Sequence, residues 1–349
     1  MSGMLKERLE KGPAKEVVKY IIRPRFKEAI NYLFEPIAQI NKAHVVMLAE
    51  QKIITNEQAS EILKALSSLD EKSVDQIELD EKEDLYLNIE RFIINESTKE
   101  LGGKVHIGRS RNDLYATAFR MAIRNKIDKV IKELIKFKKE ELKLAEDNLE
   151  TVMPGYTNLQ HAQPITLAHY LVGHSNAITR DIARLENAYE FTNLNPLGAA
   201  ALATTSFPIN RKRTTDLLGF REPIVNSLDA IVSRDYLLDF ISALAITMSD
   251  IGRLVEDLIL WNTLEFGMVE VADEYSGTSS IMPQKKNPSS LEHCRAKVGH
   301  VYGNLVAAFT IMKAIPFMSC RDITGEIYPT LWPGIDQGMI AVKIVTGVV

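Results

Sequence analysis

The chain has 349 residues, 46% of them hydrophobic and 25% charged, and its formal net charge is -4. This composition is ordinary for a globular protein, and without a basic stripe carrying aromatic residues it gives no reason to expect a nucleic-acid partner. Two cysteines are too few for a disulfide framework, and neither they nor the histidines show a metal-ligand spacing. We therefore expect no metal and no cofactor.

The N-terminal residues are charged and contain no apolar run, so no signal peptide is expected. No segment reaches about 18 uninterrupted apolar residues, which is the length that a membrane-spanning helix needs. These features predict a cytoplasmic protein without membrane contacts.

Helical patterns dominate the chain, and no β-alternation of useful length is present. The first hundred residues are expected to hold shorter helices, one of which follows Thr55 as its N-cap. Longer patterns cover 114–150, 166–192, 232–265 and 289–314. In the first of these, apolar residues recur at steps of three or four along one helical face, namely Phe119, Ile123, Ile127, Val130, Leu134 and Phe137.

Helices of this length are typical of a bundle shared between subunits. The sequence therefore predicts an all-α protein, with an N-terminal helical domain over 1–113 and a central long-helix bundle over 114–349. Four segments rich in Gly, Pro and polar residues interrupt the helices, at 102–113, 153–164, 195–208 and 277–292. Because loops on a rigid scaffold often carry functional residues, these segments are where we expect a site.

The segment "GTSSIMPQKKNPSSLE" places Ser279 and Ser280 among small residues, with Lys285 nearby. A serine hydroxyl becomes a useful base when backbone N–H groups and a nearby ammonium lower its pKa. The alternative is a solvated turn before a helix, with Ser289 or Ser290 as the N-cap.

The other segments offer groups that bind carboxylates. "GRSRND" carries arginines at a helix start, which favours anions, although an N-cap flanked by solvated arginines has the same pattern. "GYTNLQHAQP" offers neutral hydrogen-bonding groups, or is a polar turn between helices. Arg234 begins an apolar helix, either as a functional residue or in a surface pair with Asp235 or Asp239. The residues concerned are Arg109, Arg111, Asn112, Asp113, Thr157, Asn158, Gln160, His161 and Gln163.

Taken together, "VHIGRSRND", "MPGYTNLQHAQPITLAHY", "NPLGAAALATTSFPINRKRT" and "SSIMPQKKNPSSLE" resemble, in order and spacing, the argininosuccinate lyase branch of the fumarase/aspartase superfamily. "EDLYLNIERFI" and "NSLDAIVSRD" add to the match. The resemblance implies an all-helical homotetramer in which three subunits build each active site. It also implies cleavage of a C–N or C–O bond in a succinyl group, with release of fumarate.

The resemblance further implies roles for individual residues. Ser279 would remove a Cβ proton, and Lys285 with Asn287 would stabilise the charge that grows on the carboxylate. Glu292 matches the glutamate that pairs with the family's histidine. The positions implied to bind substrate are Arg111, Asn112, Thr157, Asn158, Gln160, Arg234, Ser280 and Met282.

Several positions depart from the family pattern. The histidine of the family's "GYTHLQ" is Asn158 here, and asparagine cannot act as a general acid or base. The histidine of "EDIH" is Tyr86, and "SCRDITGEI" stands where the family contacts the arginine end of its substrate. Tyr86, Ser319 and Thr324 are thus the possible amine-side residues. The glycine before the serine is Thr278, with Gly277 one position earlier.

These departures favour a C–N lyase that releases fumarate from an N-substituted aspartate whose amine is not arginine. One alternative is an authentic argininosuccinate lyase in which His161 substitutes for the missing histidine. Others are a non-catalytic structural or regulatory homologue and a cycloisomerase of the same superfamily. Family members continue beyond "KIVTGVV" into a last bundle helix and a C-terminal domain, so we expect a shortened chain.

Overall fold

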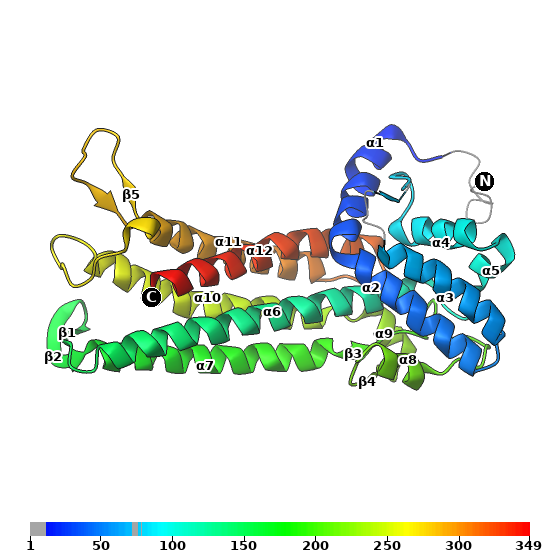
Figure 1. Cartoon of the computed structure of the whole chain (residues 1–349), viewed down its shortest axis with the longest axis horizontal. Helices are drawn as coiled ribbons and strands as arrows, with labels where there is room; N and C mark the ends of the chain where they lie inside the picture. Colours follow the sequence, from blue (N-terminus) through cyan, green and yellow to red (C-terminus); the bar gives the residue numbers. More distant parts are fainter. Residues whose placement is uncertain (1–11, 72–75, 78) are drawn as a thin grey trace. The chain divides into compact units, whose positions relative to one another are not determined.

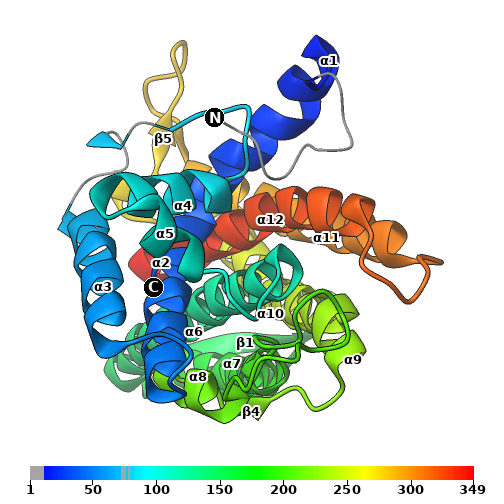
Figure 2. The same ribbon diagram turned by 90° about the vertical axis from the view of Figure 1, so that its right-hand side faces the viewer.

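The chain folds into two compact units in the computed structural model, which describes residues 12–71, 76, 77 and 79–349 (Figures 1 and 2). Unit 1 combines the described residues up to Ala122 with Asn193–Ser233 and Phe317–Ser319. Unit 2 contains Ile123–Thr192, Arg234–Pro316 and Cys320–Val349. The domain boundary predicted at residue 113 stays a prediction.

Unit 1 is built mainly of helices that pack on α2 (Arg23–Glu50). This helix has 28 residues, so the expectation that only shorter helices occupy the first hundred residues was wrong. Pro36 interrupts the helical signal in the sequence but is accommodated inside α2. The other elements are α1 (Lys15–Val17), the π-helix η1 (Val18–Ile22), α3 (Asn56–Glu71), α4 (Leu85–Glu96), α5 (Lys99–Lys104), β3 (Leu194–Asn195), α8 (Arg211–Leu217), β4 (Glu222–Pro223) and α9 (Ser227–Val232).

The predicted N-cap at Thr55 is confirmed. Its Oγ1 accepts a hydrogen bond from the Gln58 backbone N–H at 3.3 Å, and the Gln58 side chain accepts one from the Thr55 N–H at 3.1 Å. This reciprocal pair is a capping box, which satisfies two backbone donors at the start of α3.

Unit 2 is a bundle of long helices, and the four long helical patterns are confirmed in it. They correspond to α6 (Arg111–Asp147), which begins in unit 1, α7 (Leu167–Thr192), α10 (Asp235–Trp261) and α11 (Ser289–Met312). The apolar face predicted for α6 is buried at all six positions. A further helix, α12 (Arg321–Val348), packs on α10 and α11, and its sequence signal is broken by Pro329 and Pro333.

The segment between α6 and α7 forms an antiparallel hairpin, β1 (Val152–Thr157) and β2 (Gln160–Thr166), although no useful strand was expected there. Thr157 faces Gln160 in the ladder, so Asn158 and Leu159 make the turn, with φ values of 53° and 58°. Positive φ at both turn residues matches a type I′ turn. Prolines and polar residues replace regular alternation in this segment, which explains why no strand was predicted there.

A second short ladder joins β5 (Gly277–Thr278) to β6 (Lys286–Asn287), after the 3-10 helix η3 (Asp273–Tyr275). The protein is thus predominantly α-helical, with two-stranded ladders confined to the connections. Within the described ranges, no helix has both the length and the apolar character to cross a membrane.

A buried ion pair joins the helices of unit 2. His174 on α7 lies 2.5 Å, Nδ1 to Oε1, from Glu141 on α6, and its Nε2 lies 3.0 Å from the Asp250 carbonyl oxygen on α10. Both acceptors require an N–H donor, so the ring is an imidazolium. Burial alone would lower the pKa of His174, but Glu141 outweighs it and raises that pKa above its ordinary value.

We predict that His174→Gln destabilises the protein by about 3 kcal/mol at pH 6, because it leaves the Glu141 carboxylate buried without its cation. A raised histidine pKa contributes stability that is complete below the unfolded pKa and is lost as pH rises through the folded pKa. The difference from wild type should therefore shrink towards pH 9 in urea unfolding. His169→Gln, at an exposed position on the same helix, is the control. A difference independent of pH would contradict the charged state of His174.

Candidate active site

The loop between β5 and β6 brings the predicted serine and lysine to its two ends. Gly277 pairs with Asn287 and Thr278 with Lys286, so Ser279 and Lys285 occupy the next pair of positions. Facing positions in an antiparallel ladder lie about 4.5–5.5 Å apart. The short ladder therefore fixes the backbone on both sides of the loop, directly before Ser279 and directly after Lys285.

The Ser279 hydroxyl is oriented by its own loop. Its Oγ accepts hydrogen bonds from the backbone N–H of Met282 at 3.0 Å and of Ile281 at 3.4 Å. Donors aimed at an oxygen favour its charged form, because they stabilise the anion more than the neutral hydroxyl. Backbone donors of this kind were expected near a serine that acts as a base, but the role of Ser279 itself stays a prediction.

The two lysines of the loop differ in their surroundings. The Lys286 ammonium lies 2.7 Å from Asp273 and 2.9 Å from Glu270, and these carboxylates raise the pKa of Lys286. Within the described part of the chain, the Lys285 ammonium has no hydrogen bond or ion pair and is exposed. Lys285 therefore carries the charge that is available to a ligand.

The start of α11 does not match the alternative of a serine N-cap. Pro288 precedes the helix, and neither Ser289 nor Ser290 caps it; the Ser290 hydroxyl instead donates to the Tyr275 carbonyl oxygen at 2.7 Å. A Cβ at Gly277 would lie 2.3 Å from Ser289 Oγ, which explains a glycine at this position. Asn287 ends β6, and Glu292 lies exposed in the first turn of α11.

The hairpin separates its polar side chains onto two faces. Thr157 and Gln160 are cross-strand partners, as are Tyr156 and His161, and successive residues of a strand point to opposite faces. The His161 ring packs on Tyr156, with centroids 5.2 Å apart. His161 thus lies on the face opposite to Thr157 and Gln160.

The hairpin and the segment that follows α10 lie at the same end of the unit 2 helices (Figure 1). The Tyr156 and Phe266 rings connect them, with centroids 6.1 Å apart. In the serine loop, Ser280 and Met282 are exposed, as are Thr157, Asn158 and Gln160 in the hairpin. These side chains are open to solvent in the single chain.

In unit 1, two of the predicted segments meet. The Asn112 side chain donates to the Ala201 carbonyl oxygen at 3.0 Å, and Arg111 forms an ion pair with Asp84. Asp84 also caps α4 by accepting from the Leu87 N–H at 3.0 Å. The sequence offered no signal for the Asp84–Arg111 pair, whose members are far apart along the chain.

Other predicted residues lie elsewhere. Arg234 precedes α10 and is only 4% exposed, so the alternative of a surface pair with Asp235 or Asp239 was wrong. Tyr86 is 2% exposed and donates to Glu90 at 3.1 Å, so the structure does not support its assignment to the amine side. Ser319 is exposed before α12, and Thr324 lies in the first turns of that helix.

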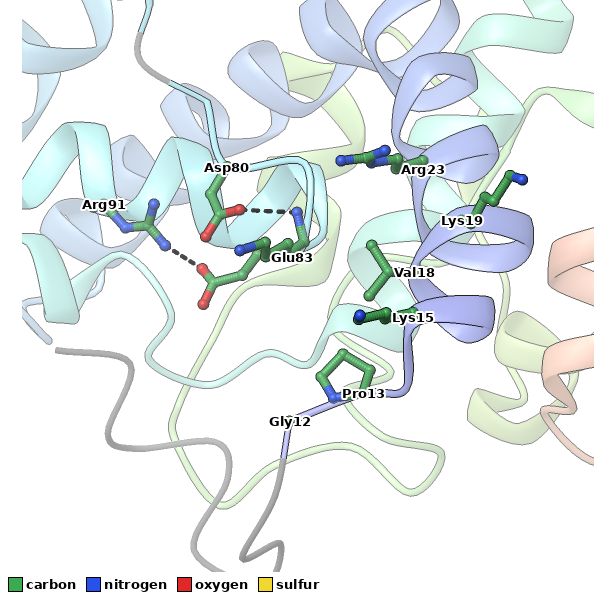
Figure 3. A pocket seen from close by; sticks show the side chains of 10 residues that line it. Gly12, Pro13, Lys15, Val18, Lys19, Arg23, Asp80, Glu83 and Arg91 are labelled. Carbon is green, nitrogen blue, oxygen red and sulfur yellow. Dashed lines mark hydrogen bonds and ion pairs between the residues drawn. The ribbon is translucent and has the colours of Figure 1, made fainter.

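A cavity of about 960 Å³ in unit 1 contains none of the predicted site residues (Figure 3). Its charged lining is mostly basic, and two of its cations are already in ion pairs, Arg91 with Glu83 and Arg23 with Glu81. It is therefore not a candidate for the site predicted from the loops.

Comparison with known proteins defines the class. The sequence profile of the lyase family matches residues 23–303. An EDDS lyase variant with bound fumarate has a TM-score of 0.84 and 36% identity, covering 97% of this chain and 67% of its own. A class II fumarase from Schistosoma mansoni, with a TM-score of 0.78 and 16% identity over 95% of this chain and 77% of its own, shows the same fold. The fold is thus that of a fumarase/aspartase-type lyase.

Curated relatives narrow the assignment. Argininosuccinate lyase from Methanocaldococcus jannaschii is 43% identical over 99% of this chain and 71% of its own length. Argininosuccinate lyase from Methanosarcina acetivorans is 40% identical over 100% of this chain and 70% of its own length. The chain belongs to the lyase family, in the argininosuccinate lyase branch of the fumarase/aspartase superfamily. It is a carbon–nitrogen lyase that forms fumarate.

We predict that Asp84→Ala lowers the free energy of unfolding by about 1 kcal/mol through loss of the α4 cap, with a smaller loss from the Arg111 pair. Asp84→Asn keeps a cap oxygen and should lose only the contribution of the pair. Thermal unfolding of both variants measures the difference. Equal losses would show that the cap contributes nothing.

Proposed function

We propose that this enzyme releases fumarate from an N-substituted aspartate whose amine is not arginine. The observation that carries the proposal is the intact serine loop beside altered amine-side positions. Ser279 Oγ accepts two backbone N–H groups, and the Lys285 ammonium has no partner among the described residues, whereas Asn158 replaces the family's histidine. The succinyl part of the site is thus retained and the amine part changed.

In the proposed reaction, Ser279 takes the proton from Cβ of the succinyl group. The electron pair of that C–H bond moves into the adjacent carboxylate, where Lys285 and Asn287 stabilise the added charge. The Cα–N bond then breaks, its electrons leave with the amine, and the Cα=Cβ double bond of fumarate forms. Arg111, Asn112 and Thr157 are proposed to hold the succinyl carboxylates.

The hairpin turn explains why asparagine can replace histidine at position 158. Asn158 has a φ of 53°, and asparagine and histidine are both enriched at positive φ among non-glycine residues. The replacement therefore keeps the turn while removing a group that can transfer a proton. This supports a change of chemistry on the amine side with the scaffold preserved.

An authentic argininosuccinate lyase is the second candidate, and the curated relatives at 40–43% identity favour it. In that case another group would have to replace the missing histidine. The position of His161 against Tyr156, on the opposite face from Thr157, counts against His161 in this role. Asn158 also suits a non-catalytic homologue, but the retained Ser279, Lys285 and Asn287 count against that alternative. The cycloisomerase has no specific observation in its favour.

We also propose a homotetramer in which three subunits contribute to each site. From Thr151 to Thr179 the chain contains no Lys, Arg, Asp or Glu, although 25% of all residues are charged. The hairpin in this stretch is largely exposed, and Leu159 at its tip is 81% exposed. Depletion of charge from an exposed surface is typical of an interface core. A cytoplasmic location remains part of the proposal.

The first test follows fumarate by its ultraviolet absorbance. Wild-type protein is mixed with fumarate and a panel of amines, diamines and amino acids that includes arginine, and argininosuccinate is supplied separately in the cleavage direction. We expect fumarate to be consumed with a non-arginine amine, and Ser279→Ala to lower that rate by about 10²- to 10⁴-fold. Ser60→Ala, at an exposed position on α3, should leave it unchanged.

Turnover of argininosuccinate alone would favour the second candidate and reject our choice of amine. A folded tetramer that is silent with every substrate would reject the proposed reaction as well.

The second test measures the molar mass by light scattering after size exclusion. Leu159→Asp places a charge at the tip of the uncharged hairpin and should shift the protein to smaller species. Leu149→Asp changes another exposed leucine, but one that lies among charged residues at the end of α6, and should leave the mass unchanged. An intact tetramer in both variants would remove the hairpin from the interface.

A further inference from the structure

The carboxylate of Asp113 is the meeting point of two loops in unit 1. Its Oδ1 accepts the backbone N–H groups of Ser110 at 2.9 Å and Leu114 at 3.0 Å. Its Oδ2 accepts those of Gly198 and Ala200, each at 2.9 Å. The side chain is fully buried. One residue therefore fixes the start of α6 and, at the same time, the loop that follows β3.

The loop over Asp113 is shaped to supply these donors. Gly198 has a φ of 90° and Ala200 a φ of 52°, so the chain turns through left-handed conformations in which alternate N–H groups face one oxygen. Such conformations are costly for a residue with a Cβ and persist only where the surroundings hold them. At Gly198 a Cβ would also lie 2.6 Å from the Arg211 side chain. The conformation of this loop depends on the anion beneath it.

Only a carboxylate satisfies all four donors. Burial raises the pKa of Asp113 to about 6, while the backbone N–H groups and Arg109 oppose that rise, so the group is ionised at neutral pH. An asparagine has one acceptor oxygen, and its NH₂ group would face two of the four N–H donors. Asparagine at this position therefore keeps the shape of the side chain but loses the two hydrogen bonds that one of the carboxylate oxygens accepts.

The residues fixed by this contact adjoin the proposed substrate site. Arg111 and Asn112 immediately precede Asp113, and the Asn112 side chain donates to the Ala201 carbonyl oxygen in the same loop. A shift of the loop therefore moves the hydrogen-bond partner of Asn112.

We propose that Asp113 is a positioning residue of the lyase site: its carboxylate holds the loop at 198–201 against the start of α6 and thereby sets the place of Asn112 and Arg111. The proposal rests on the proposed function for its effect on catalysis, but the contact itself can be measured independently. The sequence analysis had assigned Asp113 only to a helix start.

The experiment compares wild type, Asp113→Asn and Asp128→Asn by two readouts. Asp128 lies exposed on α6, where it pairs with Lys132, so the same substitution there is a matched control. Hydrogen–deuterium exchange of residues 197–207 reports the loop directly, without any activity. Steady-state kinetics in the direction of addition report KM for fumarate and for the amine separately.

We expect Asp113→Asn to raise exchange at 198–201 at least about tenfold while leaving α7 and α10 protected, since a buried hydrogen bond to a charged group contributes about 1.5–3 kcal/mol. We expect kcat/KM for fumarate to fall by up to about a hundredfold, as small displacements of positioning groups do, with KM for the amine unchanged. Asp128→Asn should behave as wild type in both readouts.

Unchanged exchange at 198–201 in Asp113→Asn would overturn the proposal. Faster exchange with unaltered KM for fumarate would overturn its catalytic part. Faster exchange in a protein whose wild type acts on no substrate would support the contact and reject the proposed function instead.

A second pair of variants serves if Asp113→Asn does not fold. Gly198→Ala disturbs the same loop from the other side, because of its φ of 90° and the nearby Arg211 side chain. Gly219 also has a positive φ, 66°, but a Cβ there would meet nothing within 4 Å, so Gly219→Ala controls for backbone strain alone. Only Gly198→Ala should raise exchange at 198–201 and KM for fumarate. Equal behaviour of the two glycine variants would overturn the proposal.

Discussion

The serine loop depends on a very short β-ladder. Two residue pairs, Gly277 with Asn287 and Thr278 with Lys286, close the loop. The roles proposed for Ser279 and Lys285 in the reaction depend on their positions at the two ends of this loop. Ser279 turns its oxygen towards the N–H groups of its own loop, and Lys285 is exposed, with no hydrogen bond or ion pair to its ammonium within the described chain. Lys286, one residue further on, is neutralised by Asp273 and Glu270. The ladder register therefore decides which lysine can act.

Much of this fold could be predicted from periodicity. The long helices of unit 2 carry apolar residues at helical spacing, and the face predicted for α6 is buried throughout. The signal failed where proline interrupts it, as in α12 at Pro329 and Pro333. It also failed for the hairpin between α6 and α7, because polar residues and prolines there replace the alternation by which strands are recognised. Contacts with α10 and α11 hold α12 despite its prolines, whereas the hairpin is held by its own ladder and turn.

The site was predicted as a set of residues but not as a set of contacts. The segments that carry Ser279, Lys285, Thr157 and Asn112 stand out by composition, since they are polar and rich in glycine or proline. Composition does not show which residues contact each other, because Asp84 and the loop at 198–201 lie far from Arg111 and Asp113 in the chain. The one local clue was Ser110 followed three residues later by Asp113, a spacing similar to a capping box. That spacing predicts the start of the helix, but it does not predict that the second oxygen of Asp113 accepts hydrogen bonds from Gly198 and Ala200.

The asparagine at position 158 has a chemical consequence for the amine. An alkyl amine is a strong base, with a pKa near that of a lysine side chain, about 10.4. Bound to a succinyl carbon, such a nitrogen is already a cation at neutral pH, so it departs as a neutral amine when the C–N bond breaks. That departure needs no proton from the enzyme, so a residue that forms hydrogen bonds but cannot transfer a proton, such as asparagine, would be sufficient at position 158. Under the proposed reaction, the missing histidine is therefore compatible with catalysis when the leaving nitrogen already carries its own proton.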